Sequence, residues 1–505
     1  MTTGIHHLTA ITRNVQANVD FYAGFLGLHL VKRTGGFEDA LQLHLFYGDA
    51  TGAPGSLVTF LDWEDGAPGR VGHGQVLEMS FAIATDSIGD WLGRALNAHV
   101  PVEGPERAFG APVLRLRDPD GIIVKLTGVP GATATPTRLS GATLLSADPE
   151  ATAAFAIRLG YRRGPEAEGA IRLISDSDTL DIRNGRGFVE GIAGTGTFDH
   201  IALRAPGDAA LRALRDELTG TQPVMVHDRT YFRSLYARDP AGVLFEYATD
   251  GPGFAVDEAP ESLGQTLFVP GDSFVPAEEI RLMLPRFALP GEPRRPRRDL
   301  PFVHRFLDPE ETDDGQVLLT LHGSGGSEAD LFPLGRQIAP GATLLGLRGR
   351  ATEEGNLRWY RRTLTGGLPT GFDQDDIRSE ARAFAAFLAD APRAYGLDPG
   401  KITLLGHSNG ASFAAATLLL DPQAVRRAIL LRPIDVLDTP PEADLSGTEV
   451  LIVSGTQDVW RDRTARLADQ LGTRGASVTH RAIAAGHTPV PEDARIARDW
   501  LATLG

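Results

Sequence analysis

Three residues near the end of the chain have types and an order that suit acyl transfer. Ser408 lies in Gly-His-Ser-Asn-Gly (406–410), between an apolar segment and an alanine-rich one. The flanking glycines permit the sharp turn that lifts a nucleophile clear of a sheet. Asp458 follows an apolar strand-like segment, and His487 lies in a loop before the last helical stretch. Ser408 is predicted to attack a carbonyl, His487 to shuttle the proton and Asp458 to hold the tautomer of the histidine.

An oxyanion hole is predicted beside this serine. Gly323 and Ser324 follow the apolar segment 317–321 in the sequence His-Gly-Ser-Gly-Gly. Such a loop supplies a backbone N–H to an oxyanion, together with the N–H of the residue after the nucleophile, Asn409. The chemistry expected here is hydrolysis of a small ester, lactone or thioester.

Residues 301–505 resemble the α/β-hydrolases of the carboxylesterase/phospholipase family. The motifs that carry the resemblance are LHGSGG (321–326), LRWYRR (357–362) and YGLDPGKITLLGHSNGA (395–411). The order serine, aspartate, histidine along the chain is that of the α/β-hydrolases. His407 and His322 are expected to support the site without catalysing, and Asp435 is the second candidate for the acid.

Two histidines and one glutamate stand out from an internal repeat in the first half of the chain. Residues 118–125 (DPDGIIVK) and 239–246 (DPAGVLFE) share an Asp-Pro-x-Gly turn that runs into an apolar strand. The second copy ends in Glu246, where the first has a lysine that cannot bind a cation. His7 and His200 lie in matching opening strands, and the other two copies have no histidine there. A 2-His-1-carboxylate face leaves room for substrate and dioxygen, so Fe(II) is the expected metal and Mn(II) the alternative.

These segments resemble the vicinal-oxygen-chelate (glyoxalase/extradiol dioxygenase) superfamily. The resemblance rests on FYAGFLGL (21–28), the paired histidines of the opening strand and DPAGVLFEYATDGPGF (239–254). Within the superfamily the hydroquinone-type ring-cleaving dioxygenases are most similar. The resemblance implies metal binding at the three positions named above and, as substrates, a small aromatic diphenol and O2.

Further residues are predicted around the metal. The resemblance implies that Arg229 and Tyr236 face the substrate, where a guanidinium stabilises a phenolate or superoxide and a phenol donates to oxygen. His6 and Thr9 are candidates to orient the substrate, although strand alternation turns His6 away from the adjacent ligand. His227 is a further acid–base candidate, and its spacing to Tyr236 is similar to that in catechol-type enzymes.

The choice between hydroquinone and catechol substrates stays open. The hydroquinone-cleaving relatives usually carry a second histidine just before the ligand in the fourth repeat, and this chain has Asp199 there. The expected substrate is therefore a hydroquinone-like or a catecholic ring.

The elements that must position these residues predict two kinds of fold. Short strand-like runs alternate with helical stretches up to residue 285, whereas strand–helix–strand patterns with long helices follow residue 300. The expected fold class is two-part, α+β and α/β, in which vicinal-oxygen-chelate modules precede a doubly wound α/β-hydrolase domain. The predicted parts are a dioxygenase-like domain (1–285), a Pro/Arg-rich linker (286–300), a hydrolase domain (301–505) and, within the first, four βαβββ modules near 4–62, 75–128, 140–185 and 197–249.

The net charge and the cysteine content limit which binding partners are expected. The chain has 505 residues, a formal net charge of -16 and no cysteine. The charge argues against nucleic acid or an anionic membrane surface as a partner. The absence of cysteine excludes disulfides and thiolate metal sites and fits a cytoplasmic protein. No signal peptide or membrane span is expected, and the sequence is compatible with a homo-oligomer.

These patterns together predict a bifunctional enzyme, a non-haem Fe(II) ring-cleaving dioxygenase fused to a serine carboxylesterase-type hydrolase. One alternative is an active esterase with a degenerate first half. Another is a first half that binds an aromatic or quinone without consuming oxygen. A glyoxalase-like isomerase would usually need a fourth ligand, and the strand at 56–62 offers no glutamate.

Overall fold

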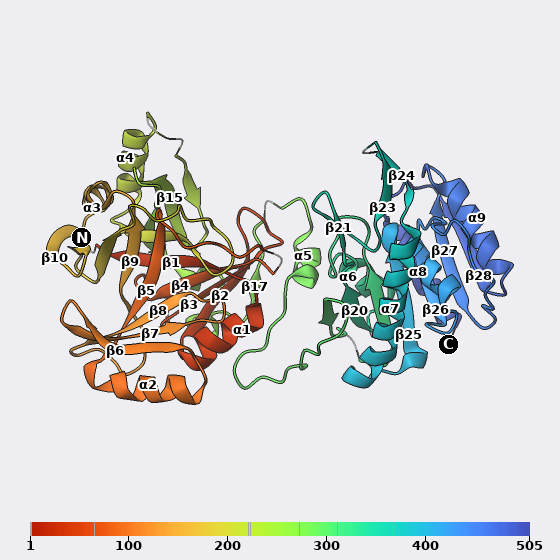
Figure 1. Cartoon of the computed structure of the whole chain (residues 1–505), viewed down its shortest axis with the longest axis horizontal. Coiled ribbons are helices and arrows are strands. Elements are labelled where there is room, and N and C mark those ends of the chain that lie inside the picture. Colours follow the sequence, from red (N-terminus) through yellow and green to blue (C-terminus); the bar gives the residue numbers. More distant parts are fainter. Residues whose placement is uncertain are drawn as a thin grey trace. The chain divides into compact units, whose positions relative to one another are not determined.

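The computed structural model describes residues 3–64, 66–220, 222, 224–271, 273–310, 312–366 and 368–504. The chain divides into two compact units, Met1–Arg294 and Arg295–Gly505 (Figure 1). Each unit has its own cluster of buried apolar side chains. In the described part of the chain, no helix is both long enough and apolar enough to cross a membrane.

The elements of the first unit follow one order, a strand, a helix and then three strands, in four successive stretches. The first stretch comprises β1 (Ile5–Thr12), α1 (Val15–Val19) with the π-helical turn η1 (Asp20–Phe25), β2 (His29–Gly35), β3 (Leu43–Gly48) and β4 (Leu57–Asp62). The second comprises β5 (Gln75–Ala84), η2 (Thr85–Ser87), α2 (Ile88–Asn97), β6 (Val102–Ala108), β7 (Ala111–Arg117) and β8 (Ile123–Val129). The third comprises β9 (Leu139–Ser146), α3 (Pro149–Arg158), β10 (Arg162–Ala167), β11 (Ala170–Ile174) and β12 (Thr179–Asn184). The fourth comprises β13 (Phe198–Ala205), α4 (Asp208–Leu218), β14 (Val226–Asp228), β15 (Phe232–Arg238) and β16 (Leu244–Pro252), and the tail adds η3 (Phe254–Val256), η4 (Pro260–Ser262), β17 (Leu267–Phe268) and α5 (Ala277–Met283).

The repeated Asp-Pro-x-Gly turns begin the last strand of two of these stretches. Asp118 Oδ1 accepts hydrogen bonds from the backbone N–H groups two and four residues later, at 2.9 and 2.8 Å. Asp239 Oδ1 does the same at 3.0 and 2.8 Å. Gly121 and Gly242 have φ angles of +90° and +92°, a region that favours glycine. The turn residues therefore fix where β8 and β16 begin.

Two sheets pair the four stretches in an order that the chain sequence does not follow. Within the described residues, the nine-stranded sheet has the order β14-β15-β16-β13-β1-β4-β3-β2-β17, so the first and fourth stretches share it. The eight-stranded sheet, β10-β11-β12-β9-β5-β8-β7-β6, joins the second and third. Strand β1 runs antiparallel to β13, with Thr9 opposite His200. Strand β13 runs parallel to β16, with Ala202 opposite Glu246. Residues from both ends of the unit thus meet at the centre of one sheet.

The second unit is built on a mostly parallel sheet. In the described residues its order is β18-β20-β19-β25-β26-β27-β28, and β18 alone runs antiparallel to its neighbour. The strands are β18 (His304–Leu307), β19 (Val317–Leu321), β20 (Thr343–Leu347), β25 (Ile402–His407), β26 (Arg427–Leu431), β27 (Glu449–Gly455) and β28 (Ser477–Ile483). The helices are α6 (Phe332–Ile338), α7 (Gln374–Tyr395), η5 (Pro399–Lys401), α8 (Asn409–Leu420), α9 (Arg461–Gly472) and α10 (Pro491–Ala502). Two hairpins lie between β20 and α7, formed by β21 (Ala351–Glu353) with β22 (Asn356–Arg358) and by β23 (Arg362–Thr365) with β24 (Leu368–Phe372).

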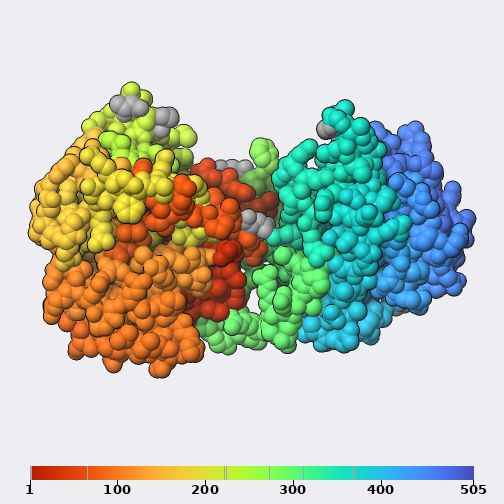
Figure 2. Space-filling view, viewed as in Figure 1, coloured from red at the N-terminus to blue at the C-terminus, as the bar shows by residue number. Residues whose placement is uncertain are grey.

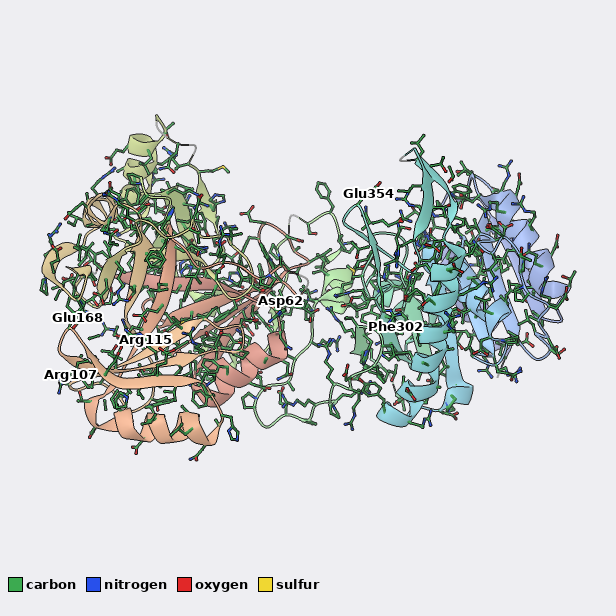
Figure 3. The ribbon with its side chains drawn as sticks, in the orientation of Figure 1. Asp62, Arg107, Arg115, Glu168, Phe302 and Glu354 are labelled. Atoms are coloured by element: carbon green, nitrogen blue, oxygen red, sulfur yellow. The ribbon has the colours of Figure 1, made fainter. Side chains whose placement is uncertain are left out.

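Burial explains why the central elements of this unit form. Strands β19 and β20 are buried along their whole length, as expected of parallel strands covered on both faces. Helix α8 is buried from Asn409 to Leu419, which explains why apolar residues occur on all of its faces. Phe302, labelled in Figure 3, packs against Trp359, Phe384 and Phe387 with ring centroids 6.0 to 6.1 Å apart. Teal and cyan residues, which include the two hairpins and α7, cover much of the visible face of this unit (Figure 2).

Candidate functional sites

Three buried side chains converge at the centre of the nine-stranded sheet. His7 comes from β1, His200 from β13 and Glu246 from β16. Glu246 Oε2 lies 3.0 Å from His7 Nε2 and 2.9 Å from His200 Nε2, and the two nitrogens are 3.3 Å apart. The structure therefore brings together the three residues that the repeat comparison singled out as metal ligands.

The chemistry of this donor set fits a divalent cation. Both carboxylate oxygens of Glu246 are buried, and among the described residues neither has a hydrogen-bond partner of good geometry. Burial raises the pKa of Glu246, but the neighbouring His7 and His200 lower it well below its usual range. A buried carboxylate without hydrogen bonds is costly unless a cation pairs with it. Two imidazoles and one carboxylate are a set that Fe(II) and other divalent transition metals accept.

The second ring nitrogen of each histidine has a partner. His200 Nδ1 lies 2.6 Å from Asp199 Oδ2. Burial lowers the pKa of His200, but the adjacent carboxylates of Asp199 and Glu246 raise it to about 9. His7 Nδ1 lies 2.9 Å from His6 Nδ1. Such contacts orient metal-ligating imidazoles and set their tautomer. Asp199, where the sequence departs from the usual histidine, thus contacts a predicted ligand directly.

The prediction that His6 points away from the adjacent ligand was wrong. The pairing of β1 with β13 shifts register between Ile5 and His7, so a bulge at His6 interrupts the alternation. The His6 ring lies against Phe232, with centroids 5.0 Å apart, and contacts the neighbouring histidine. His6 is not one of the residues that line the adjacent cavity. Its position therefore suits support of His7 and not contact with a substrate.

A cavity of about 260 Å³ opens beside the three ligands. Its lining residues are His7, Thr9, Gly36, Phe37, Glu38, Gln42, His44, Phe46, Leu61, Asp199, His200, Arg229, Phe232, Tyr236 and Leu244. Arg229 and Tyr236 face this cavity, and the guanidinium lies over the phenol ring with its Cζ 5.4 Å from the centroid. Arg229 Nη2 also donates to Glu38 Oε1 at 3.0 Å. Thr9 Oγ1 lies 2.9 Å from His200 Nε2.

Two histidines near the cavity differ from the sequence-based expectations. His227 packs with its ring edge against Tyr236, at a centroid distance of 5.7 Å, and is not a lining residue among those described. His44 lines the cavity, although no motif marked it. Its Nε2 lies 2.9 Å from Thr59 Oγ1, which in turn lies 2.9 Å from Thr9 Oγ1. Burial and the charge of His7 lower the pKa of His44 to about 3, so its ring is neutral.

Strand register identifies the counterparts of the ligands in the other sheet. In the pairing of β13 with β16, the residue opposite Glu246 lies two positions after His200. In the pairing of β5 with β8, the residue opposite Lys125 lies two positions after Glu78. Lys125 and Glu78 therefore take the places of a carboxylate ligand and an imidazole ligand, and they form an ion pair.

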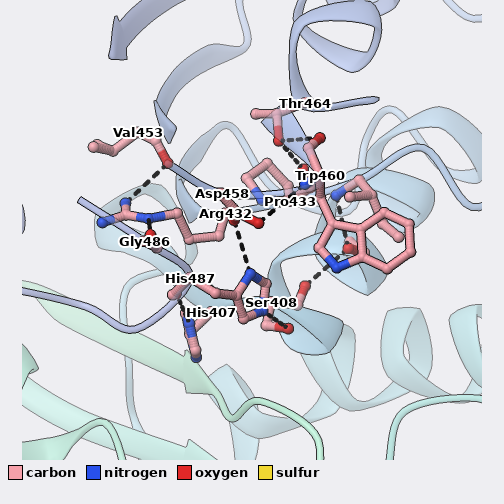
Figure 4. A network of polar contacts seen from close by, with 12 residues as sticks. His407, Ser408, Arg432, Pro433, Val453, Asp458, Trp460, Thr464, Gly486 and His487 are labelled. Carbon is pink, nitrogen blue, oxygen red and sulfur yellow. Dashed lines mark hydrogen bonds and ion pairs between the residues drawn. The ribbon is translucent and has the colours of Figure 1, made fainter. Parts of the chain in front are cut away.

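The second unit contains a serine, a histidine and an aspartate in one line of hydrogen bonds (Figure 4). Ser408 Oγ lies 2.7 Å from His487 Nε2, and His487 Nδ1 lies 2.8 Å from Asp458 Oδ2. Asp458 is buried, whereas the side chain of His487 is 40% exposed. Asp435, the second candidate acid, instead pairs with Arg463 at 2.5 Å. Of the two candidate acids, Asp458 is therefore the one that contacts His487.

The turn that carries Ser408 is sharp and crowded. Ser408 has φ 53° and ψ -113° between β25 and α8, a conformation that few non-glycine residues adopt. A Cβ at Gly406 would lie 2.6 Å from Ala411 Cα, and one at Gly410 would collide with the carbonyl oxygen of Leu321. Glycine at both positions is therefore required by close packing, which explains the motif around the serine.

The predicted oxyanion loop follows β19. Ser324 and Asn409 line the cavity at Ser408, whereas Gly323 is not among its lining residues. Asn409 Oδ1 accepts a hydrogen bond from the backbone N–H of Trp359 at 2.8 Å, which fixes the start of α8. Ser324 Oγ accepts one from Arg358 Nη1 at 2.9 Å.

The two supporting histidines contact backbone groups. His407 Nε2 lies 3.1 Å from the carbonyl oxygen of His487, and His322 Nε2 accepts a hydrogen bond from the Gly349 N–H at 2.9 Å. Burial lowers the pKa of His407 to about 4, so its ring is neutral. These contacts suit a role in holding the loops that carry the site.

A cavity of about 410 Å³ lies beside the serine. It is lined by Ser324, Arg358, Tyr360, Arg362, Thr370, Gly371, Phe372, Ser408, Asn409, Ser412, Arg432, Ile434, Trp460, Arg463 and His487. No role was predicted for its four arginines. Arg358 and Arg362 lie in the motif LRWYRR (357–362), which supports the resemblance only, and Arg432 and Arg463 lie after β26 and on α9.

Both halves of the chain are similar to known proteins. Residues 4–126 match the model of the Glyoxalase/Bleomycin resistance protein/Dioxygenase superfamily. The Bacillus subtilis protein "Putative ring-cleaving dioxygenase MhqO" is 36% identical over 316 residues, which cover 58% of this chain and 98% of that protein. The chain belongs to the Glyoxalase/Bleomycin resistance protein/Dioxygenase superfamily. A further relative, "Chlorohydroquinone/hydroquinone 1,2-dioxygenase" from Sphingobium indicum, is 28% identical and covers 53% of this chain and 91% of its own length.

The chain is larger than these superfamily members because it has a second, unrelated part. The Bacillus subtilis protein "Putative hydrolase MhqD" is 34% identical over 193 residues, which cover 38% of this chain and 94% of that protein. The chain is therefore a fusion of a part similar to ring-cleaving dioxygenases of the superfamily with a part similar to a hydrolase.

Proposed function

We propose that the chain is a bifunctional enzyme in which an Fe(II) ring-cleaving dioxygenase is fused to a serine carboxylesterase-type hydrolase. Its first substrates are O2 and a hydroquinone-like or catecholic ring, and its second is an ester, lactone or thioester. The observation that carries the proposal is the convergence of His7, His200 and Glu246 beside a cavity that His7 and His200 line and that is large enough for one aromatic ring. The activity for which the Sphingobium indicum relative is named favours a hydroquinone.

Domain limits belong to the same proposal. The dioxygenase half comprises residues 1–285 with four βαβββ modules, and the hydrolase half comprises 301–505 with a doubly wound sheet. The joining segment 286–300 contains neither helix nor strand. This division is supported by separate apolar cores on the two sides of the segment.

The residues at the first cavity would bind and orient a diphenol. Bound Fe(II) supplies the one-electron chemistry that makes O2 reactive towards an aromatic ring. The Arg229 guanidinium stabilises negative charge on a phenolate oxygen. Burial and the charge of Glu246 hold the pKa of Tyr236 well above its usual range, so its hydroxyl remains a donor. Phe37, Phe46 and other apolar side chains surround the ring and exclude water.

The residues at the second cavity would perform acyl transfer. Ser408 Oγ attacks the carbonyl carbon while its proton passes to His487 Nε2. The same proton then reaches the leaving oxygen or sulfur, and water repeats the sequence to release the acid. Asp458 holds the Nδ1 proton of the histidine. Backbone N–H groups of the loop after β19 and of Asn409 stabilise the oxyanion.

Oxygen consumption tests the first activity. The full chain is reconstituted anaerobically with Fe(II) and offered hydroquinone, chlorohydroquinone or catechol, with His200→Ala and Ser408→Ala as variants. We expect uptake that is lost in His200→Ala and kept in Ser408→Ala. An exposed histidine at the start of β2 provides the matched control, His29→Ala, which should keep both metal and uptake. Protein that holds iron but consumes no oxygen with any diphenol would contradict the dioxygenase proposal.

Hydrolysis of 4-nitrophenyl acetate tests the second activity. We expect turnover by the wild type and by His200→Ala and none by Ser408→Ala. An unchanged rate in Ser408→Ala would place the hydrolysis elsewhere on the chain.

A further inference from the structure

We propose that the cavity beside Ser408 selects carbonyl substrates that carry a second group, an ionised carboxylate. This inference rests on the proposed hydrolase function and names its substrate class. Four arginines line the cavity, namely Arg358, Arg362, Arg432 and Arg463. Among the described residues that line it, none is aspartate or glutamate.

One of the four arginines is neutralised within the fold. Arg432 and Asp493 are both fully buried and joined by two hydrogen bonds of 2.8 and 3.0 Å. Arg432 also donates to the carbonyl oxygens of Gly486 and Val453, as Figure 4 shows. Its guanidinium therefore holds the loop that carries His487, which leaves Arg358, Arg362 and Arg463 to bind a ligand.

Two arginines on the hairpins share one part-buried carboxylate. Glu353 Oε2 lies 3.3 Å from Arg358 Nε and 2.8 Å from Arg362 Nε. The side chain of Glu353 is 15% exposed, and those of the two arginines are 17% and 18% exposed. Glu354 lies 3.5 Å from Arg362 but is 74% exposed, so solvent screens most of its effect. This wall of the cavity therefore carries excess positive charge.

The third arginine, Arg463, lines the cavity from α9. Arg463 Nε donates to Asp435 Oδ1 at 2.5 Å, and Arg466 Nε lies 3.3 Å from Asp435 Oδ2. Again one carboxylate serves two guanidinium groups. The cavity is thus bounded by three part-buried guanidinium groups, and the carboxylates of Glu353 and Asp435 that pair with them are not among its lining residues.

Guanidinium groups placed in this way recognise carboxylates. Each has five N–H donors in a planar fork. Arg358 also donates to Ser324 Oγ and Arg463 to the carbonyl oxygen of Asp435, and these contacts leave further N–H donors of each group for a ligand. Hydrogen bonds between charged groups in a part-buried site are about twice as strong as neutral ones. Phe372, Ile434 and Trp460 supply apolar lining for the carbon skeleton between the carboxylate and the reacting carbonyl.

The class of reaction that supplies such a substrate agrees with the first half of the chain. Cleavage of a diphenol ring beside a hydroxyl inserts both atoms of O2, breaks one carbon–carbon bond, and leaves one carboxyl and one carbonyl group. A product of this kind is an anion. If one of its remaining hydroxyl groups is then acylated by another acid, with loss of water or of the acyl carrier, the resulting ester retains the carboxylate that the arginines would bind; closure to a lactone would instead consume this carboxyl group.

Matched pairs of charged and neutral esters test the inference with the full chain. In one pair the acyl group carries the charge, mono-4-nitrophenyl glutarate against its methyl ester. In the other the leaving group carries it, 4-acetoxybenzoate against methyl 4-acetoxybenzoate. Ser408→Ala gives the blank for spontaneous hydrolysis. We expect kcat/KM to favour the charged member of at least one pair about tenfold, the equivalent of one hydrogen bond to a charged group. The preference should fall as salt is added.

Single arginine variants then show which side chains cause the preference for charged esters. Arg362→Gln and Arg463→Gln should each lower the ratio of kcat/KM between charged and neutral esters several-fold. Arg361 supplies the matched control because it is exposed, pairs with Asp376 at 3.1 Å and does not line the cavity. Arg361→Gln should keep the wild-type ratio. A wild-type ratio near one in both pairs, or a ratio that neither cavity variant changes, would overturn the inference.

The outcomes separate this inference from the proposed function. If no ester of either charge is hydrolysed, the hydrolase proposal itself fails. If charged and neutral esters are hydrolysed equally well, only the substrate class is wrong. A measurement on the wild type needs no variant: glutarate should inhibit hydrolysis of 4-nitrophenyl acetate competitively and more strongly than glutaramide. Equal inhibition by the two would also contradict the proposed charge selection.

Discussion

Lys125 Nζ lies 2.7 Å from Glu78 Oε1 inside the eight-stranded sheet, at the place that corresponds to the candidate metal ligands of the nine-stranded sheet. Register extends the correspondence to the third ligand, since His7 matches Gly141. Both charged side chains are 6% exposed, and Glu78 also pairs with Arg115 at 2.7 Å. A side-chain ammonium thus supplies in one sheet the positive charge that a divalent cation would supply in the other.

Removal of the ammonium should destabilise the first unit. Lys125→Met leaves Glu78 buried with Arg115 as its remaining cation. Loss of one partner from a buried ion pair costs several kcal/mol, and we expect about 3 kcal/mol of unfolding free energy here. Urea unfolding followed by circular dichroism measures this change. Arg117→Met is the matched control, because its pair with Glu103 is exposed and should contribute at most about 1 kcal/mol. Equal effects of the two variants would contradict the assignment.

The same ion pair predicts a dependence of stability on pH. Burial raises the pKa of Glu78, but Lys125 and Arg115 lower it to about 2, from an ordinary value of 4.5. Folding therefore favours the ionised carboxylate, so its contribution is present above about pH 4.5 and is lost as the pH falls towards 2. The difference in unfolding free energy between wild type and Glu78→Gln should shrink by about 3 kcal/mol across this window. A difference that is constant between pH 6 and pH 3 would show that the carboxylate is not stabilised in its charged form.

Asp199 should strengthen metal binding without being a ligand. Its Oδ2 lies 2.6 Å from His200 Nδ1 and orients the ring towards the other two ligands. We expect Asp199→Asn to weaken metal affinity about tenfold, as is usual for a partner of a metal-ligating imidazole. Competition with a chromophoric chelator measures the affinity directly, and circular dichroism checks that the fold is kept. Asp228→Asn, on the exposed end of β14, is the control. Unchanged affinity in Asp199→Asn would remove the proposed orienting role.

Residue type and repeat position were sufficient to predict which residues come together as candidate metal ligands, and chain order was sufficient to predict the contacts of the serine, histidine and aspartate of the second unit. Each lies in a local motif whose chemistry is visible in a few consecutive residues. His6 could not be placed in this way, because strand alternation assumes regular pairing and the bulge after Ile5 depends on the partner strand. No role was predicted for the arginines of the second cavity, because β22, β23, α9 and the loop after β26 come together only in the folded unit.

Asp458, and not Asp435, is expected to act as the acid that holds His487. Asp458 Oδ2 lies 2.8 Å from His487 Nδ1, whereas Asp435 is occupied by Arg463. An amide in place of the first carboxylate would favour the wrong tautomer of the histidine, so Asp458→Asn should lower kcat for 4-nitrophenyl acetate about 10⁴-fold. Asp435→Asn should cost far less, because it leaves the histidine and its partner unchanged. Stopped-flow and steady-state rates with equal amounts of folded protein measure both effects. If Asp435→Asn were the more damaging change, the proton of His487 would depend on a carboxylate other than the one it contacts, and the proposed roles of the two aspartates would have to be exchanged.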